Sequence, residues 1–372
     1  MIDFSWTGCT RGLSVFFVFL YTLFVVFYYR KNVTNFSFQK KKGDLWMILF
    51  ALVLIIIVAA SDQSDWFSYQ RLVKSYDFTP GAYYHTEPIY GFIIRIVNRN
   101  YLSFRIIVWG GAFLLVGLTF KRFEINQNVS IFLLVTAFLL TFNYARATLA
   151  MACYFYGLSF LIKPTKGLGV WNLFLMAVFF FGAYSFHHSL LALVLLTVLV
   201  YLPLNKPYMI VIMLIGLPII AMIMKDSFAL VDVFEEEALS NKLEMYSNIQ
   251  KGRMSLFGLL RYTIQYGSFY VPIVLNTIIV MKHYRQLDWP IIRLHRIMIA
   301  TTVFSLAFLF MGFENQIMYY RFLYMTFIPI VIISVYLLEH SLLKKRQYTA
   351  IVLLGMLNQL YTLLYAIYFQ NK

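Results

Sequence analysis

The sequence has little charge and almost no cysteine. Of its 372 residues only 13% are charged and 61% are hydrophobic, whereas a soluble protein has about 25% charged residues. A soluble core of this length cannot hide so much apolar surface, but a bilayer can. Cys9 and Cys153 are the two cysteines, too few for a disulfide framework or a cysteine metal site. The composition therefore indicates an integral membrane protein.

Motifs for nucleic-acid binding are also missing, although the net charge is +15. The sequence has no RRM, zinc-knuckle or Gly-rich phosphate pattern. Its basic residues sit in short loops between apolar runs, where Lys and Arg hold a loop in the cytoplasm. We attribute the positive charge to membrane topology and expect no nucleic-acid partner.

Long apolar runs dominate what is present. A spanning helix needs about 20 mostly apolar residues, and twelve stretches qualify, with an uncertainty of one or two because two pairs are closely joined. We predict an all-α integral membrane protein with about 11–12 transmembrane helices in one domain over residues 1–372. The predicted spans are 13–29, 45–60, 102–119, 129–143, 145–162, 170–186, 188–203, 208–224, 262–281, 293–312, 318–338 and 348–369.

Every second loop is basic, which predicts the orientation. These loops, predicted to be cytoplasmic, follow the first, third, fifth, seventh, ninth and eleventh spans, and the loop after the ninth includes Arg293 and Arg296. The other loops then face the periplasm. Two of them are long, at about 61–101 and 225–261. Long outer loops of a membrane enzyme commonly hold a polar substrate, although the second loop could equally be a solvated connector.

Ionisable residues near membrane depth are costly and indicate function, and five groups lie at the predicted outer face. Asp62 and Asp65 are three residues apart and share one face if helical. They could orient or deprotonate a hydroxyl or bind a divalent ion. Alternatively, Ser61 or Asp62 caps an amphipathic helix. Glu87 precedes a helix that Pro88 could open, and it could equally act as a cap.

Two further groups open or close predicted spans. Arg146 begins a span otherwise free of charge, and its planar fork suits a phosphate, although an arginine there could also be an interfacial anchor. His187 and His188 are adjacent, so the two rings face different directions, and a zinc pair would need i, i+4 spacing. One of them could act as an acid or base, or as a hydrogen-bond donor.

The fifth group lies in GFENQIMYYRFLYM, near the end of the chain. Arg321 sits just inside a predicted span, where Glu314 could pair with it or a phosphate could bind it. Tyr319 and Tyr320 precede it. Taken together, the arginines suit a phosphate or pyrophosphate, and the acids and aromatic rings suit sugars. This combination indicates a protein that handles a large polar, anionic ligand at the outer leaflet.

Five short motifs resemble the EpsG-like branch of Wzy-type O-antigen and exopolysaccharide polymerases. They are SDQSDWFSY, EPIYGFI, NYARATLAMA, FHHSLL and YYRFLYM. The family usually has a residue such as Gln after the helix-opening arginine, whereas this sequence has Ala147. The resemblance implies a GT-C-like architecture and a glycosyltransferase of the bacterial inner membrane, active at the periplasmic face without a metal or other cofactor.

The resemblance also implies the substrate and the roles of the residues. Such enzymes join repeat units carried on undecaprenyl pyrophosphate, so the expected partners are these lipid-linked glycans and the bilayer, with a chain-length regulator as a further candidate. Arg146 and Arg321 would hold the pyrophosphate, together with the substrate-binding candidates Tyr319, Tyr320, Glu314 and His188. One of the catalytic candidates would act on the acceptor hydroxyl: Asp62, Asp65, Glu87 or His187.

Two alternative functions fit part of the pattern. A flippase for the same lipid-linked sugar would need charges at mid-membrane and a cavity reachable from both sides, whereas the interiors of these spans are nearly free of charge. Another GT-C enzyme, such as an O-antigen ligase, would share the same face and the same arginines, and only its substrate would distinguish it.

Overall fold

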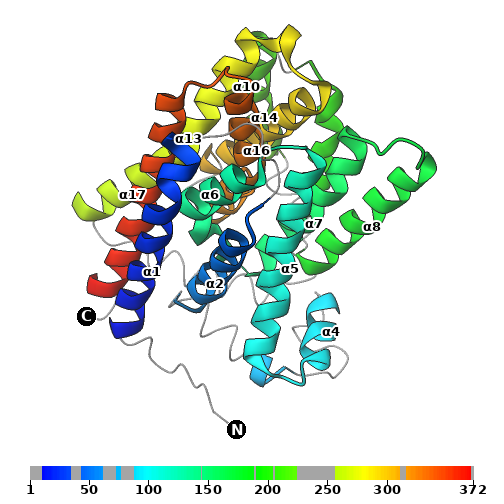
Figure 1. The fold of residues 1–372 in the computed structure, drawn as a ribbon. Coiled ribbons are helices and arrows are strands. Elements are labelled where there is room, and N and C mark those ends of the chain that lie inside the picture. The colour runs from blue at the N-terminus through cyan, green and yellow to red at the C-terminus, as the bar shows by residue number, and fades with distance from the viewer. Residues whose placement is uncertain are drawn as a thin grey trace. The chain divides into compact units, whose positions relative to one another are not determined.

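The computed structural model describes residues 11–34, 43–61, 73–76, 88–143, 145–187, 190–203, 206–223, 256–310 and 316–369. All regular structure in these ranges is helical (Figure 1). The α-helices are α1 Arg11–Tyr29, α2 Leu45–Ser61, α4 Pro88–Ile96, α5 Tyr101–Arg122, α6 Gln127–Phe138, α7 Ala145–Ile162, α8 Val170–Phe186, α9 Leu190–Leu196, α10 Pro207–Ile223, α13 Leu256–Lys282, α14 Trp289–Phe310, α15 Gln316–Tyr324, α16 Phe327–Glu339 and α17 Lys345–Phe369. Shorter helical turns are η1 Arg30–Thr34, η3 Leu139–Asn143, η4 Thr197–Tyr201 and η6 Tyr284–Gln286.

Helical elements coincide with all twelve predicted spans. Within the described residues, five helices are long and apolar enough to cross a membrane, and several shorter apolar helices accompany them. The prediction of an all-α integral membrane protein is therefore confirmed. The GT-C-like architecture and the single domain stay predictions.

The span predicted over 318–338 is broken into α15 and α16. The break falls at Met325 and Thr326, whose backbone N–H groups turn back to Phe322 and Leu323 at 3.1 Å each. Pro329 explains the position, because a proline has no N–H and its ring clashes with the carbonyl four residues earlier, here that of Met325.

A second difference concerns the start of α14, which begins at Trp289 rather than at 293. Pro290 suits the first helical turn, where its missing N–H would be unpaired in any case. The carbonyl of Asp288 accepts from the N–H groups of the next two residues, 291 and 292. Arg293 and Arg296, which were counted with the basic loop after the ninth span, lie inside this helix, in agreement with the predicted span 293–312.

The chain divides into two compact units, residues 1–195 with 331–372 and residues 196–330. In the first unit α7 packs against both α5 and α8. Aromatic rings fill the α7–α8 interface: Tyr154 stacks on Phe180 at 5.1 Å between centroids, and Tyr156 meets Phe179 edge-on at 4.7 Å. Gly157 allows this approach, because a Cβ there would lie 2.8 Å from that of Phe179.

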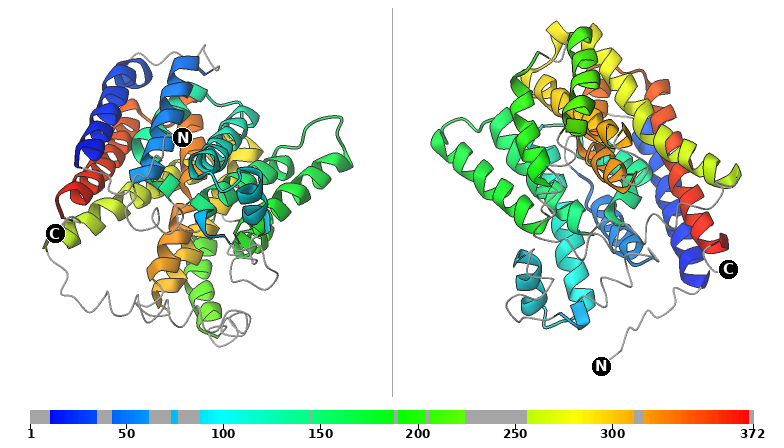
Figure 2. Two further views of the ribbon diagram at one scale, coloured as in Figure 1. Left: turned by 90° about the horizontal axis from the view of Figure 1, so that it is seen from below. Right: turned by 180° about the vertical axis from the view of Figure 1, so that it is seen from behind.

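Helix α6 lies at the centre of the first unit. Its residues from Asn128 to Phe138 are all buried, and α1, α2, α5 and α17 pack around it. Tyr21 of α1 donates to the carbonyl of Thr136 at 2.7 Å, and Gln359 of α17 donates to that of Ala137 at 2.8 Å. The first and last helices, α1 and α17, lie side by side in both views of Figure 2.

Four of the predicted cytoplasmic loops meet at one end of this unit. Arg122, at the end of α5, donates to Ser159 Oγ at 2.6 Å and to the carbonyl of Lys163 at 2.9 Å. Lys163 pairs with Glu124 at 2.9 Å. The loops after the third and fifth predicted spans are thereby joined.

Two further loops reach the same end. The backbone N–H of Asn126, which begins the turn into α6, donates to Glu339 at 2.9 Å. The N–H of Asp44 donates to Asn128 Oδ1 at 2.7 Å, and the Asp44 carboxylate pairs with Lys31 at 2.6 Å. Four of the six predicted cytoplasmic loops, those after the first, third, fifth and eleventh spans, therefore lie together in the first unit.

In the second unit α14 packs against α10, α13, α15 and η4. Helix α14 is strongly buried along its length. Polar contacts also tie it to α13, since His295, which is 1% exposed, lies 3.2 Å from the hydroxyl of Thr277. This helix is the core of the second unit.

Candidate functional site

Arg146 and His187 lie at the same level of the α7–α8 pair. The two helices run antiparallel, and the stack of Tyr154 on Phe180 sets their register. Arg146 lies eight residues before Tyr154, about 12 Å along the axis, and His187 lies seven residues after Phe180, about 10 Å along it. Both residues therefore belong to the end of the unit opposite Arg122 and the predicted cytoplasmic loops.

Helix α5 adds a third ionisable residue to this end, Arg105. The Trp109 indole N–H donates to the carbonyl of Phe142 at 2.6 Å, and Phe142 lies four residues before Arg146 in the sequence. Arg105 is only 3% exposed. Its guanidinium lies 5.0 Å from the Tyr101 ring centroid and 5.7 Å from that of Trp109, so aromatic faces stabilise the buried cation.

Arg105 was missed by the sequence reasoning, although a signal was present. It lies inside the span predicted over 102–119, where a charge is costly. Tyr101, Arg105 and Trp109 follow one another at i, i+4 and i+8, so they form one stripe along a helix. A cation between two aromatic residues at this spacing predicts a shielded charge.

His187 is held at the turn between α8 and α9. It ends α8 in an extended conformation, with its N–H bonded to the carbonyl of Ala183 and its own carbonyl accepting from Leu190, each at 3.0 Å. Its side chain is half-buried. The backbone is therefore fixed on both sides of a histidine that keeps partial access to its surroundings.

The described parts of the long 61–101 loop pack at this same end. Tyr90 of α4 meets Phe104 of α5 edge-on at 5.3 Å, and α4 also packs against α8 (Figure 1). Arg99 donates to the carbonyl of Tyr76 at 3.0 Å. The α4 helix therefore lies beside the end that carries Arg105 and His187.

In the second unit, tyrosines from α13 and α15 form an aromatic cluster. Tyr266 stacks on Tyr320 at 5.2 Å with nearly parallel rings and lies 5.4 Å from Tyr319. The hydroxyls of Tyr319 and Tyr270 are hydrogen-bonded at 2.8 Å, and Tyr319 is 2% exposed. Tyr324 extends the cluster and bonds to Gln265. Tyr319 thus holds the first turns of α15, which carry Tyr320 and Arg321.

Several predicted site residues lie beyond what the structure describes. The backbones of Arg146 and Arg321 lie in α7 and α15, but their side chains are outside the description. Whole residues outside the described ranges are Asp62, Asp65, Glu87, His188 and Glu314. The site prediction therefore stays a prediction, with Arg146 and His187 brought to one level of the first unit.

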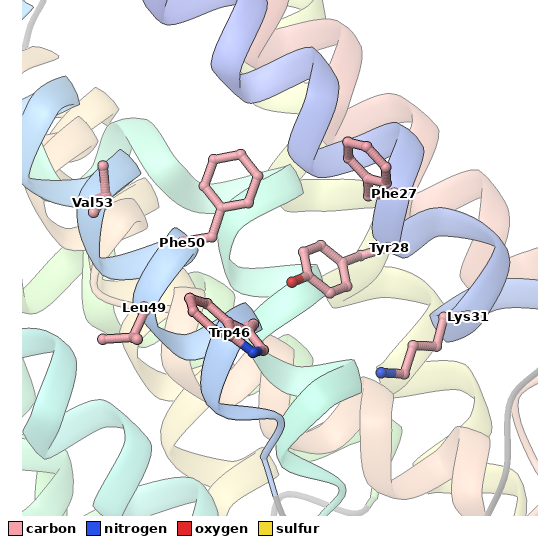
Figure 3. Close-up of a pocket in the computed structure, with 7 residues that line it drawn as sticks. All are labelled: Phe27, Tyr28, Lys31, Trp46, Leu49, Phe50 and Val53. Atoms are coloured by element: carbon pink, nitrogen blue, oxygen red, sulfur yellow. The ribbon is translucent and has the colours of Figure 1, made fainter.

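A pocket of about 540 Å³ between α1 and α2 lies elsewhere. In Figure 3, Tyr28 of α1 and Trp46 of α2 reach into the gap between the two helices. Its lining is apolar except for Tyr28 and Lys31, and Lys31 is paired with Asp44. It lies at the end where the predicted cytoplasmic loops meet, so it is separate from Arg105 and His187. Over the described ranges, no group of three His, Cys, Asp or Glu side chains could hold a metal ion.

Comparison with known families adds one decisive match. Residues 44–372 match the model of the EpsG family. The chain belongs to the EpsG family. The match covers α2 through α17, and therefore both units and every described residue of the candidate site. Comparisons with curated proteins and with solved structures find no match.

Membership of the EpsG family confirms the resemblance inferred from the five motifs. This EpsG-family chain is a polysaccharide polymerase-like membrane protein with several membrane-spanning helices.

Proposed function

We propose that this EpsG-family protein polymerises oligosaccharide repeat units carried on undecaprenyl pyrophosphate, at the periplasmic face of the bacterial inner membrane. The family match over residues 44–372 carries the proposal. It is supported by the grouping of Arg105, the Arg146 backbone and His187 at the end of the first unit opposite the basic loops, because basic loops favour the cytoplasm.

In the proposed reaction, a hydroxyl of the incoming lipid-linked unit attacks the anomeric carbon of the growing chain. The bond between that carbon and the pyrophosphate oxygen breaks, and undecaprenyl pyrophosphate leaves. The hydroxyl proton passes to a base, for which His187, Asp62, Asp65 and Glu87 are the candidates. The developing negative charge of the leaving group requires cations, because fixed charges in a water-poor site stabilise it strongly.

Arginines at this end suit the leaving group. A guanidinium can donate two parallel hydrogen bonds to a phosphate, which fixes its position as well as its charge. Arg146 is the sequence candidate for this role in the first unit, and Arg105 is a further one, buried and stabilised by Tyr101 and Trp109. In the second unit, the aromatic cluster around Tyr320 provides ring faces that suit a sugar.

The test is a gel ladder of surface polysaccharide from cells that lack the gene. Wild type should restore the ladder, whereas Arg105→Gln, Arg146→Gln and His187→Ala should give single repeat units at normal expression. Lys166→Gln is the matched control, because Lys166 is exposed beyond the opposite end of α7, and its ladder should be normal.

Two results would refute the polymerase proposal. Loss of all surface repeat units on deletion would indicate a flippase. Long chains left unattached would indicate a ligase. A normal ladder from all three site variants would retain the polymerase but refute the site.

A further inference from the structure

Two arginines lie inside α14, at the end of the second unit that adjoins the basic loop after α13. Arg293 and Arg296 are five and eight positions into a helix that begins at Trp289. At a rise of 1.5 Å per residue they lie about 6 and 10 Å along the axis. This helix is apolar enough to cross a membrane, and cations at such a depth are costly unless they have a partner.

Arg296 is held rigidly. It is 3% exposed, and it donates through Nη1 to the carbonyl of Val200 at 2.7 Å and through Nη2 to the hydroxyl of Tyr284 at 3.1 Å. Its Nε is buried and has no hydrogen-bond partner among the described residues. Its two bonds go to neutral oxygens, so neither neutralises its charge.

Arg293 has contacts of a different kind. Its guanidinium lies 5.4 Å from the Tyr201 ring centroid and 5.3 Å from that of Trp289, while that of Arg296 lies 5.0 Å from the same Trp289 ring. The Nε of Arg293 is also buried without a hydrogen-bond partner in the described part of the chain. Two like charges therefore share one indole.

The two cations have no paired countercharge among the residues that the structure describes. In the described ranges, no carboxylate pairs with either guanidinium. Cation–π contacts offset part of the desolvation cost, but they leave the net charge of the pair and their mutual repulsion in place. An anion bound between the helix and the rings of Tyr201 and Trp289 would neutralise the two arginines. It would also accept a hydrogen bond from the unpaired Nε of Arg293.

We propose that Arg293, supported by Arg296, forms a phosphate-binding site in the N-terminal turns of α14. Tyr201 and Trp289, 59% and 48% exposed, form its rim, since such rings favour the boundary between apolar tails and water. The basic loops predict that this end faces the cytoplasm. The site therefore takes a phosphate on the side opposite the proposed polymerisation, either from an inner-leaflet lipid headgroup or from a soluble phosphate compound.

Arg293 and Arg296 have separate tasks in this site. Arg296 holds the end of η4 through Val200 and the η6 turn through Tyr284, so it builds the site and adds to its positive potential. The Nε of Arg293 is buried without a hydrogen-bond partner among the described residues, so Arg293 is the direct ligand. Variants of Arg293 therefore test binding with the least risk to folding.

The experiment uses the full-length protein, purified and delipidated in detergent. One arm adds phosphatidylglycerol, with diacylglycerol as the control lipid that has no phosphate, and measures retained lipid by native mass spectrometry. The other arm titrates inorganic pyrophosphate and measures binding by calorimetry. Arg293→Gln should weaken phosphate-dependent binding about tenfold, and Arg293→Lys less, because the charge remains. The control Arg285→Gln removes an exposed charge from the same loop region and should change binding less than about twofold.

The outcomes distinguish the two sources of phosphate and test whether the site exists. Retention of phosphatidylglycerol that depends on Arg293 identifies a lipid headgroup, and pyrophosphate binding that depends on Arg293 identifies a soluble source. Equal losses in Arg293→Gln and Arg285→Gln would overturn the site, because the attraction would then be diffuse. Absence of phosphate-dependent binding in both arms of the wild type would also overturn it. A normal elution profile and polysaccharide ladder for Arg293→Gln would establish that the variant folds.

Discussion

The contact between α17 and α6 leads to a sharp stability prediction at Gly355. A Cβ added at Gly355 would lie 2.3 Å from the Cβ of Ala137 and 2.5 Å from its Cα, and the Cα belongs to a helix backbone that cannot rotate away. The helices would have to separate by roughly 1 Å to reach ordinary contact distances. The same movement would strain the bond from Gln359 to the carbonyl of Ala137.

The magnitude follows from these two effects. Overpacking of a core typically costs about 1–3 kcal/mol, and a lost buried hydrogen bond adds about 1 kcal/mol. We therefore expect Gly355→Ala to destabilise the protein by roughly 2–4 kcal/mol and to lower its apparent melting temperature by about 5 °C. Gly117→Ala is the matched control, because no atom lies within 4 Å of a Cβ added there. Alanine favours a helix over glycine by about 1 kcal/mol.

A buried thiol makes the measurement direct. Cys153 is free and 5% exposed, so in a Cys9→Ser background a thiol-reactive dye reports its exposure on heating. Gly355→Ala should react at a lower temperature than wild type, and Gly117→Ala at the same or a higher one. Equal curves for the two alanine variants would refute the reasoning, since they would show that α17 and α6 adjust at no cost.

Three further predictions concern contacts that position the candidate site or the opposite end. Trp109→Phe removes the hydrogen bond from the indole N–H to the carbonyl of Phe142, so it should cost about 1 kcal/mol and shorten the polysaccharide ladder; a wild-type melting curve would contradict this. Tyr270→Phe removes the hydrogen bond to Tyr319 and should destabilise the protein by about 1 kcal/mol, so Cys153 should react with the dye at a lower temperature. A dye curve equal to that of wild type would contradict this prediction. Arg122→Gln should lower the melting temperature, because it removes bonds to the end of α7 worth about 1–2 kcal/mol in total, yet it should leave the ladder intact; single repeat units at normal expression would show that this end also takes part in the reaction.

The spans could be predicted from the sequence because a bilayer imposes one simple rule on length and polarity. Local exceptions were harder. The interruption at Met325 depends on Pro329, a local backbone signal that the mean hydropathy of the segment does not contain. Helix α14 begins four residues before the predicted span, because Pro290 is well suited to the first helical turn. In each case a local backbone signal competed with an average property of the segment.

The candidate site could be predicted only in part. Arg146 and His187 were found because charges beside apolar runs stand out, but their common level depends on the register of α7 and α8. That register is set by the stacking of Tyr154 on Phe180, and such interdigitation follows from the three-dimensional fit of side chains rather than from spacing along one helix. Arg105 was missed because a single charge does not disqualify a long apolar segment as a span, and its shielding by Trp109 is visible only in the structure.

The central position of α6 has a consequence for how the protein is made. Its partners on α17 come late: Tyr348 bonds to the carbonyl of Val129, and Gln359 to that of Ala137, across 219 and 222 residues. At ordinary rates of synthesis the ribosome needs roughly 10–40 s to make such a length of chain. During that interval the face of α6 that packs against α17 has no partner. A nascent chain stalled before α17 should therefore be a target for membrane chaperones and proteases.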